Sequence, residues 1–253
     1  MKKEFIIILL LGISFTVNAQ SIADWQIGLN INPFIFNRIN SNYKPEKASQ
    51  DFPNGFGFGL TIEKNWNEHW GIKTGLEYTN QNLKYDNYWF TGNVYSSIMK
   101  SEFKYYKLPI TVQYYYQIKE NLFFIFNQGI QFSFLDDYKT TIDDELQTII
   151  ITPKNFNNYD KNSNTNHIFP NNFTLYKNNT FGLIGSVGLK GFISKKISYS
   201  TNLRYEYDIT TSESTDAFFS DNHNTKNFRI GLELGLQYHF SLGGCDFCKN
   251  QKH

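Results

Sequence analysis

Two cysteines near the end of the chain have a spacing that suggests a chemistry. Cys245-Asp246-Phe247-Cys248 follows Gly243-Gly244. A Cys-x-x-Cys pair is a redox motif when it opens a helix of a thioredoxin-like fold, and two thiolates supply half of a zinc site. The surrounding sequence offers neither that context nor further ligands. In an oxidising compartment, a local disulfide or an attachment point is the more modest interpretation.

Histidine is the second candidate for chemistry. His239 lies near Glu206 and Glu233 on one predicted face, where it could be a general base or a metal ligand. The five histidines are scattered, however, with His167 and His223 in predicted loops, and no ligand spacing or Ser-His-Asp arrangement stands out. The sequence therefore predicts no catalytic residue, no cofactor and no metal site, and a protein that is not an enzyme.

The chain begins with the pattern of a secretory signal peptide. A basic start, Met1-Lys2-Lys3, precedes an apolar run from Phe5 to Val17 and a small-residue cleavage site that ends at Ala19. The run is shorter than the roughly 20 residues of a spanning helix. The cleavage point is followed directly by Gln20 and not by a cysteine, which argues against a lipoprotein. We therefore expect a signal peptide of residues 1–19, a barrel domain of residues 20–242 and a periplasmic tail of residues 243–253.

The remaining chain alternates apolar and polar residues with a period of two. This period indicates strands with two different faces. Aromatic residues make up 18% of the chain, an excess that suits the aromatic girdles of a membrane barrel. Eight segments carry the alternation: 25–32, 55–63, 70–78, 106–116, 122–134, 181–190, 197–209 and 228–242.

The connections between these segments differ systematically in length. Short links at 65–69, 119–121 and 194–196 alternate with long ones at 37–54, 84–102, 136–180 and 210–227. Short periplasmic turns and long extracellular loops are typical of outer-membrane barrels. A soluble lipocalin-like barrel or sandwich would carry many Lys and Glu on its polar faces, whereas here Gly, Ser, Thr, Asn and Gln predominate. The sequence thus predicts an all-β, transmembrane, antiparallel up-and-down β-barrel of eight strands.

Charged residues on the polar faces point into the predicted lumen. One reading is a selective pore. The other, which we favour, is a network of ion pairs that fills the lumen, because an eight-stranded barrel is just wide enough for its own side chains. The cations are Lys73, Lys107, Lys190, Arg204 and Arg229, and the anions are Glu63, Glu77, Glu206, Asp208 and Glu233.

The connection 136–180 is the longest and is rich in asparagine with interspersed aromatics. A long loop without structure of its own is usually functional or disordered. It could be a contact surface for a protein, a glycan or a phage, and the asparagines could equally reflect the base composition of the genome. The residues concerned are Asn155, Asn157, Asn158, Asn162, Asn164, Asn166, Asn171, Asn172, Phe156, Tyr159, Phe169, Phe173 and Tyr176.

Three segments resemble a known family. Residues 105–112 (Tyr-Tyr-Lys-Leu-Pro-Ile-Thr-Val), 57–60 (Gly-Phe-Gly-Leu) and 70–78 (Trp-Gly-Ile-Lys-Thr-Gly-Leu-Glu-Tyr) are similar to strands of the PorT-like outer-membrane barrels of the Bacteroidota. The resemblance implies a small outer-membrane barrel without catalytic residues, and one branch of the family serves type IX secretion and gliding. The tail after Leu242 departs from a family that commonly ends at its last strand. Pro109 within a strand predicts a bulge or local bend.

The expected function follows from these features. We expect a non-enzymatic integral outer-membrane barrel that acts through partners, either as a secretion or assembly accessory or as a surface-contact protein. The alternatives are a transport barrel for a small solute and, third, a lipid-modifying enzyme with a site at the rim. Expected partners are outer-membrane lipid and other envelope or type IX secretion proteins. The net charge of +1 implies no nucleic acid partner.

Overall fold

The computed structural model describes residues 25–40, 54–88, 97–170, 175–194, 196–214 and 225–240. Within these ranges the named elements are all strands, and no helix is long and apolar enough to cross a membrane. The predicted signal peptide, the C-terminal tail with Cys245 and Cys248, and His223 lie outside the described residues, so these predictions stay open.

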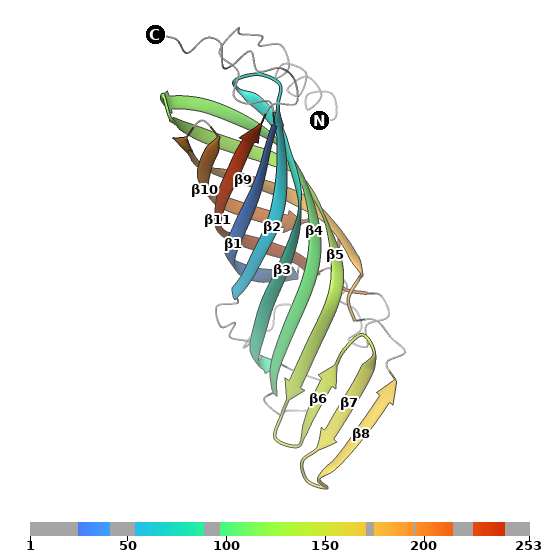
Figure 1. The fold of residues 1–253 in the computed structure, drawn as a ribbon. Coiled ribbons are helices and arrows are strands. Elements are labelled where there is room, and N and C mark those ends of the chain that lie inside the picture. Colours follow the sequence, from blue (N-terminus) through green and yellow to red (C-terminus); the bar gives the residue numbers. More distant parts are fainter. Residues whose placement is uncertain are drawn as a thin grey trace, which may run out of the picture.

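Eight strands form a closed antiparallel ring (Figure 1), which confirms the predicted barrel. Each ring strand pairs with the ring strands that precede and follow it in the chain, β4 with β5 among them. The pairing of the first strand with the last, β1 with β11, closes the ring. The strands are β1 (Trp25–Asn40), β2 (Asn54–Asn65), β3 (Trp70–Tyr88), β4 (Ser97–Lys119), β5 (Leu122–Asp143), β9 (Asn179–Ser194), β10 (Ile197–Asp208) and β11 (Thr225–Phe240).

Alternation along each ring strand separates a polar inside from an apolar outside. On β10, Leu203 is 49% exposed, whereas the next residue, Arg204, is 3% exposed. The same pattern runs along β1, β2 and β11, where the outward side chains are mostly Ile, Leu and Phe. An apolar exterior around a polar interior is the arrangement of a barrel surrounded by lipid. The inward and outward faces predicted from the sequence are therefore correct.

The ring has two different ends. The short turn between β2 and β3 (residues 66–69) and that between β4 and β5 (residues 120–121) lie at one end, where β1 begins and β11 finishes. We call this the turn end and the opposite one the loop end. In outer-membrane barrels the short turns face the periplasm.

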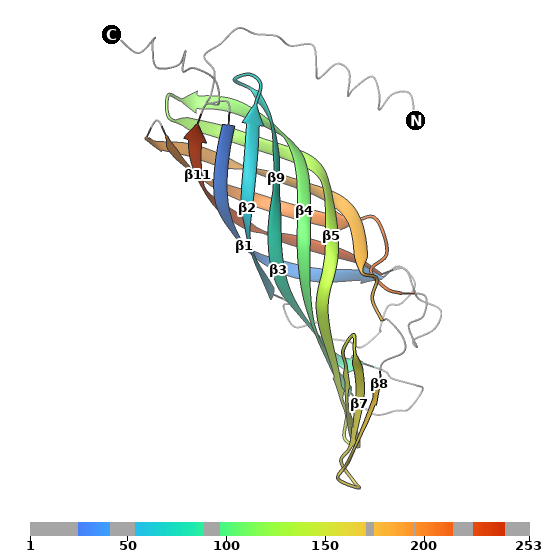
Figure 2. The same ribbon diagram turned by 45° about the vertical axis from the view of Figure 1, so that its right-hand side comes forward.

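At the loop end the strands run farther than predicted, and the long connection is not without structure. β3 reaches Tyr88, β4 starts at Ser97 and β5 continues to Asp143. Three further strands follow, β6 (Gln147–Ile151), β7 (Asn155–Asp160) and β8 (Thr165–Pro170). They extend the sheet from β5 beyond the ring (Figures 1 and 2). We call residues 97–104 and 137–143 with β6, β7 and β8 the arm.

A β-bulge explains why the alternation in the sequence ends where the arm begins. Lys104 pairs with Asp137 and Tyr105 with Leu135, so Asp136 is an extra residue on β5. The bulge moves the inward face of β5 from odd positions, such as Ser133, to even positions, such as Tyr138. A search for one unbroken period of two therefore stops at this point, although the strand continues.

Of the two expectations for Pro109, a bulge or a local bend, the bulge is wrong. Pro109 pairs with Gln131 of β5, and its strand keeps one register with β3 on both sides, from Thr74↔Ile110 to Glu77↔Lys107. The proline instead interrupts the β3–β4 ladder without shifting it, because it has no N–H to donate. Its carbonyl accepts a hydrogen bond of 2.9 Å from the Thr74 hydroxyl.

The turn at the tip of the arm is stabilised by its own side chains. The backbone N–H groups of Ser163 and Asn162 donate to the Asp160 carboxylate and lower its pKa. Asn164 adopts a φ of 53°, the left-handed conformation that asparagine tolerates best after glycine. The tip thus has a defined conformation outside the ring.

Candidate functional site

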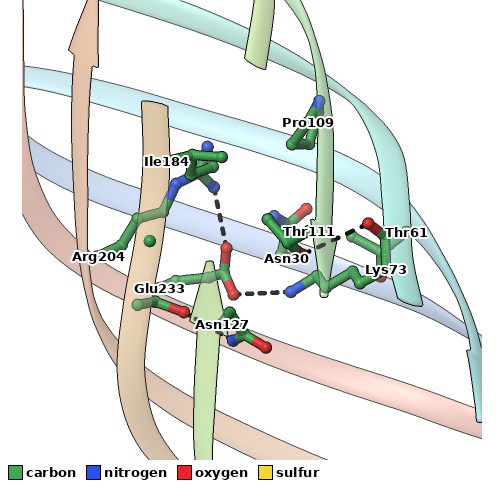
Figure 3. A pocket seen from close by; sticks show the side chains of 11 residues that line it. Asn30, Thr61, Lys73, Pro109, Thr111, Asn127, Ile184, Arg204 and Glu233 are labelled. Carbon is green, nitrogen blue, oxygen red and sulfur yellow. Dashed lines mark hydrogen bonds and ion pairs between the residues drawn. The ribbon is translucent and has the colours of Figure 1, made fainter. Parts of the chain in front are cut away.

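The centre of the lumen is organised around Arg204. Its guanidinium lies 2.7 Å from Glu77, 2.9 Å from Glu233 and 2.7 Å from Glu206. Lys73 contacts the other oxygen of Glu233 at 2.8 Å, so that Glu233 lies between two cations (Figure 3). Strands β3, β10 and β11 are linked across the lumen by these four contacts.

A second group of charges lies closer to the loop end. Glu206 accepts from Lys107 at 2.8 Å and from Arg229 at 3.3 Å. Arg229 also lies 3.5 Å from Asp208, whose carboxylate accepts a 2.7 Å hydrogen bond from Asn227. Since Glu206 also contacts Arg204, this second group and the group around Arg204 form one continuous network.

A third group lies toward the turn end. Lys190 donates to Glu63 at 2.9 Å and also contacts the side-chain oxygen of Gln26. The Tyr115 hydroxyl donates to Glu63 at 3.3 Å. All ten charges predicted to face inward are thus buried, and each belongs to at least one ion pair.

These contacts leave little free space at the centre of the barrel. A cavity of about 20 Å³ lies there, lined among others by Asn30, Thr111, Asn127 and Arg204 (Figure 3). A volume of this size holds about one water molecule. The side chains therefore fill the lumen at this level, as expected for a small barrel.

A cluster of buried apolar side chains closes the loop end, and the sequence analysis missed it. On β1 the cluster is in phase with the polar lumen residues: Phe34 and Phe36 continue the face of Asn30 and Asn32. We call the cluster the cap. Its members are Phe34, Phe36, Leu83, Met99, Phe103, Tyr105, Tyr138, Ile142, Ile149, Ile151, Leu175 and Tyr176.

Arg38 joins the cap to two connecting segments. Its guanidinium lies 5.6 Å from the ring centre of Phe103 and 5.1 Å from that of Tyr176. The same group contacts Glu213 at 2.9 Å and donates to the Ser212 hydroxyl at 3.2 Å. The cation thus lies against two aromatic rings and pairs with a carboxylate.

The two connecting segments, residues 175–178 and 211–214, pair with each other over the cap. We call them together the strap. The Lys177 N–H donates to the Ser212 carbonyl at 2.9 Å, and the Ser214 N–H donates to the Leu175 carbonyl at 3.0 Å. Tyr176 of the strap packs edge-to-face on Phe103 at 4.8 Å and on Tyr138 at 4.9 Å. The cap is therefore covered by ordered backbone.

His239 does not meet the carboxylates that the sequence suggested. Its Nε2 lies 2.6 Å from the Ser198 hydroxyl, and its ring packs on Phe192 at 4.9 Å. Glu206 and Glu233 are held by the cations of the network. His239 and Glu233 share a face, but six residues of strand separate them by roughly 20 Å. Over the described ranges, no group of three or more His, Cys, Asp or Glu is placed to hold a metal ion.

The ion pair between Lys190 and Glu63 gives a first test of the network. The single variant Lys190→Met leaves a buried carboxylate without its cation, whereas the double variant Lys190→Met/Glu63→Gln removes both charges and keeps an acceptor for Tyr115. Breaking one side of a buried pair costs about 3–5 kcal/mol, and removing both charges is often nearly neutral. We expect the double variant to unfold at a higher urea concentration than the single variant. The reverse order would contradict a paired, water-poor lumen.

A family model agrees with this architecture. The family model described as outer membrane protein beta-barrel domain matches residues 18–212. No curated protein matches the chain. Among solved structures, the outer membrane protein OprG from Pseudomonas aeruginosa has 15% identity and a TM-score of 0.47, with 89% of this chain and 100% of that chain covered.

Two further structures show similarly distant likeness. Ail, the attachment invasion locus protein of Yersinia pestis, has 16% identity and a TM-score of 0.38, with 86% of this chain and 99% of that chain covered. Neisserial surface protein A has 12% identity and a TM-score of 0.41, with 85% and 96% covered. Because the family model spans most of the ring, the chain belongs to the outer membrane protein beta-barrel domain family. Together with the apolar outward face of the ring, this shows that the chain is a β-barrel of the bacterial outer membrane.

Proposed function

We propose that this protein is a closed, non-enzymatic barrel that acts through other proteins, which it contacts with its arm on the cell surface. The observation that carries the proposal is the combination of a lumen filled by ion pairs and an apolar cap with a sheet that continues far beyond the ring. A barrel that offers no path through its centre can work only with its outer surfaces.

The filled lumen argues against the transport alternative. A solute would have to separate Arg204 from three carboxylates and then displace the cap above them. Leaving buried charges without their partners costs several kcal/mol for each pair. Permeation along the axis is therefore costly at two successive levels.

The outward surface of the arm is charged, as is typical of a sheet exposed to water. The outward face of its β4 and β5 segments carries charges of both signs, with Lys104 of β4 3.7 Å from Asp137 of β5. Asp143 of β5 also lies 2.9 Å from Lys161 of the β7–β8 turn. Such a face is costly to place in lipid. The arm therefore supports a role in contacts outside the membrane.

The resemblance to PorT-like barrels of the Bacteroidota supports a partner in secretion or assembly. In this proposal the protein is an accessory of a secretion or assembly machine of the envelope, of which the type IX secretion system is one example. A surface-contact protein would use the same arm toward a molecule outside the cell. In both cases the contacts leave the ring itself unchanged.

Single-channel recording in planar bilayers tests the closed lumen. We expect the purified protein to insert without giving stepwise conductance, because the network and the cap obstruct the axis. A porin reconstituted in the same way serves as the positive control for insertion and recording. A stable open state in most insertions would overturn the proposal and favour the transport alternative.

Crosslinking in native outer membranes tests the role through partners. A photoreactive amino acid at Thr148 or Tyr159, both on the outward face of the arm, should give a discrete adduct with another protein. The same group at Leu203, which faces lipid in the ring, is the control and should give none. Absence of any adduct from the arm would remove the support for the proposal.

A further inference from the structure

We propose that an extended, uncharged segment of another protein adds as a further strand to the edge of β8. This inference rests on the proposed function and names the surface and the type of partner. Strand addition uses the main-chain groups of an exposed sheet edge for affinity and alternate side chains for specificity.

β8 is the last strand of the sheet, whose order ends β5-β6-β7-β8. Among the described residues it pairs with β7 alone, from Asp160↔Thr165 to Asn155↔Pro170. Within the closed part of the ring the strands have no such edge, because β4 pairs with β5 and β1 with β11. In an antiparallel ladder, every second residue of an edge strand directs its N–H and C=O away from its neighbour.

The side chains along this edge are open to solvent. Residues 165–168 are all exposed, and Ile168 is 63% exposed, which is high for an isoleucine in a sheet. Solvent thus reaches the edge along four of its six residues.

The edge also lacks the features that keep natural sheet edges from pairing. Such edges usually carry lysines or other charges, bulges or prolines along their length. β8 reads Thr-Asn-His-Ile-Phe-Pro, with no Lys, Arg, Asp or Glu and a regular register with β7, and its proline is the last residue. An unprotected edge of this kind, presented outside the barrel, favours pairing with another strand.

Charge determines which partner fits. On β6, β7 and β8 the outward face consists of two cross-strand rows without charge, Thr148–Tyr159–Asn166 and Ile150–Asn157–Ile168. The first row continues onto Asp143 of β5, whose charge is already paired with Lys161 of the β7–β8 turn at 2.9 Å. A strand added to β8 places its own side chains beside Asn166 and Ile168, where apolar and amide side chains pack and a charge finds no counter-ion. The pair of Lys104 and Asp137 lies farther back, on β4 and β5. The partner segment is therefore uncharged and rich in strand-forming residues.

A second copy of the chain fits this edge less well. A stable interface uses about 20–30 residues on each side, and β8 offers six. Two copies joined only by their β8 strands would be held by a fraction of that surface. A different protein can add contacts to the faces of the arm as well as to its edge.

Hydrogen exchange of β8 tests the proposal. The exchange of amides in residues 165–170 is measured by mass spectrometry for the full chain in native outer membranes and for the purified protein in nanodiscs. We expect exchange at alternate positions to be roughly tenfold slower or more in the native membranes, because an added strand protects those amides. Equal exchange in both samples would overturn the proposal.

Two lysine substitutions separate the edge from the face. Asn166→Lys puts a charge on the edge, and Thr148→Lys puts the same charge in the same cross-strand row, two strands away. We expect Asn166→Lys to abolish the protection and Thr148→Lys to retain it. Loss of protection in both variants would mean a partner on the face and would overturn strand addition.

The result also distinguishes this inference from the proposed function. If the arm gives crosslinked adducts in membranes while β8 exchanges freely, the proposed function stands and strand addition is wrong. If β8 is protected in nanodiscs and loses protection on dilution, the occupant is a second copy, which contradicts the partner named here.

Discussion

Replacement of Arg204 with methionine is expected to destabilise the barrel by about 3–5 kcal/mol. Methionine fills much of the same space but leaves Glu77, Glu206 and Glu233 facing one another without the cation that lies 2.7–2.9 Å from each. Lys73 still neutralises Glu233, and Lys107 still neutralises Glu206. Glu77 is therefore the carboxylate that is left without a cation in contact. The urea midpoint of unfolding from detergent micelles, followed by the loss of heat-modifiable migration in gels, measures the effect.

Two variants control this experiment. Arg204→Lys keeps the charge but cannot reach three carboxylates with one compact ammonium group, and we expect an intermediate loss. Lys139→Met removes a charge from the exposed outward face of the arm, where the cost should stay below about 0.5 kcal/mol. If Arg204→Met and Lys139→Met shifted the midpoint equally, the network would not stabilise the ring.

The sequence was sufficient to predict the ring and the content of its lumen. Because side chains alternate strictly along a strand, the position of Leu203 next to Arg204 fixes which of them faces lipid. The same parity assigned the ten charges to the inside, and balanced numbers of cations and anions in a narrow barrel favoured pairing. Which carboxylate meets which cation depends on the stagger of strands around the ring, and His239 shows that a shared face does not imply contact.

The arm and the cap could not be predicted because each breaks the rule used to find strands. The bulge at Asp136 reverses the parity of β5, so a continuing strand looks like the start of a loop. The cap places Phe34, Phe36 and Phe103 on the inward face, where the pattern assigns polar residues. Their aromatic rings then look like ordinary members of an apolar run. β6, β7 and β8 are each six residues long or shorter, and β7 and β8 contain asparagine, which disfavours strands.

Replacement of Phe103 with alanine is expected to loosen the cap, with a loss of about 3–5 kcal/mol in the stability of that region. Phe103 is 1% exposed, and its ring meets Tyr176 at 4.8 Å and Phe36 at 6.1 Å. It also forms one of the two faces against which Arg38 lies. Removing it creates a cavity and withdraws one support of the strap. Amides of residues 177 and 214, which donate across the strap, should exchange faster, while those of the ring strands stay protected.

The matched control is Phe132→Ala, which removes the same side chain from the lipid-facing side of β5, where it is 37% exposed. That variant should lose apolar contact with lipid but leave the strap amides unchanged. The ion-pair network lies between the cap and the turn end, and Phe103 is not part of it. Phe103→Ala should therefore still give no stepwise conductance in planar bilayers. A conducting Phe103→Ala barrel would instead show that the cap alone closes the axis and that the charges beneath it leave a continuous path for ions.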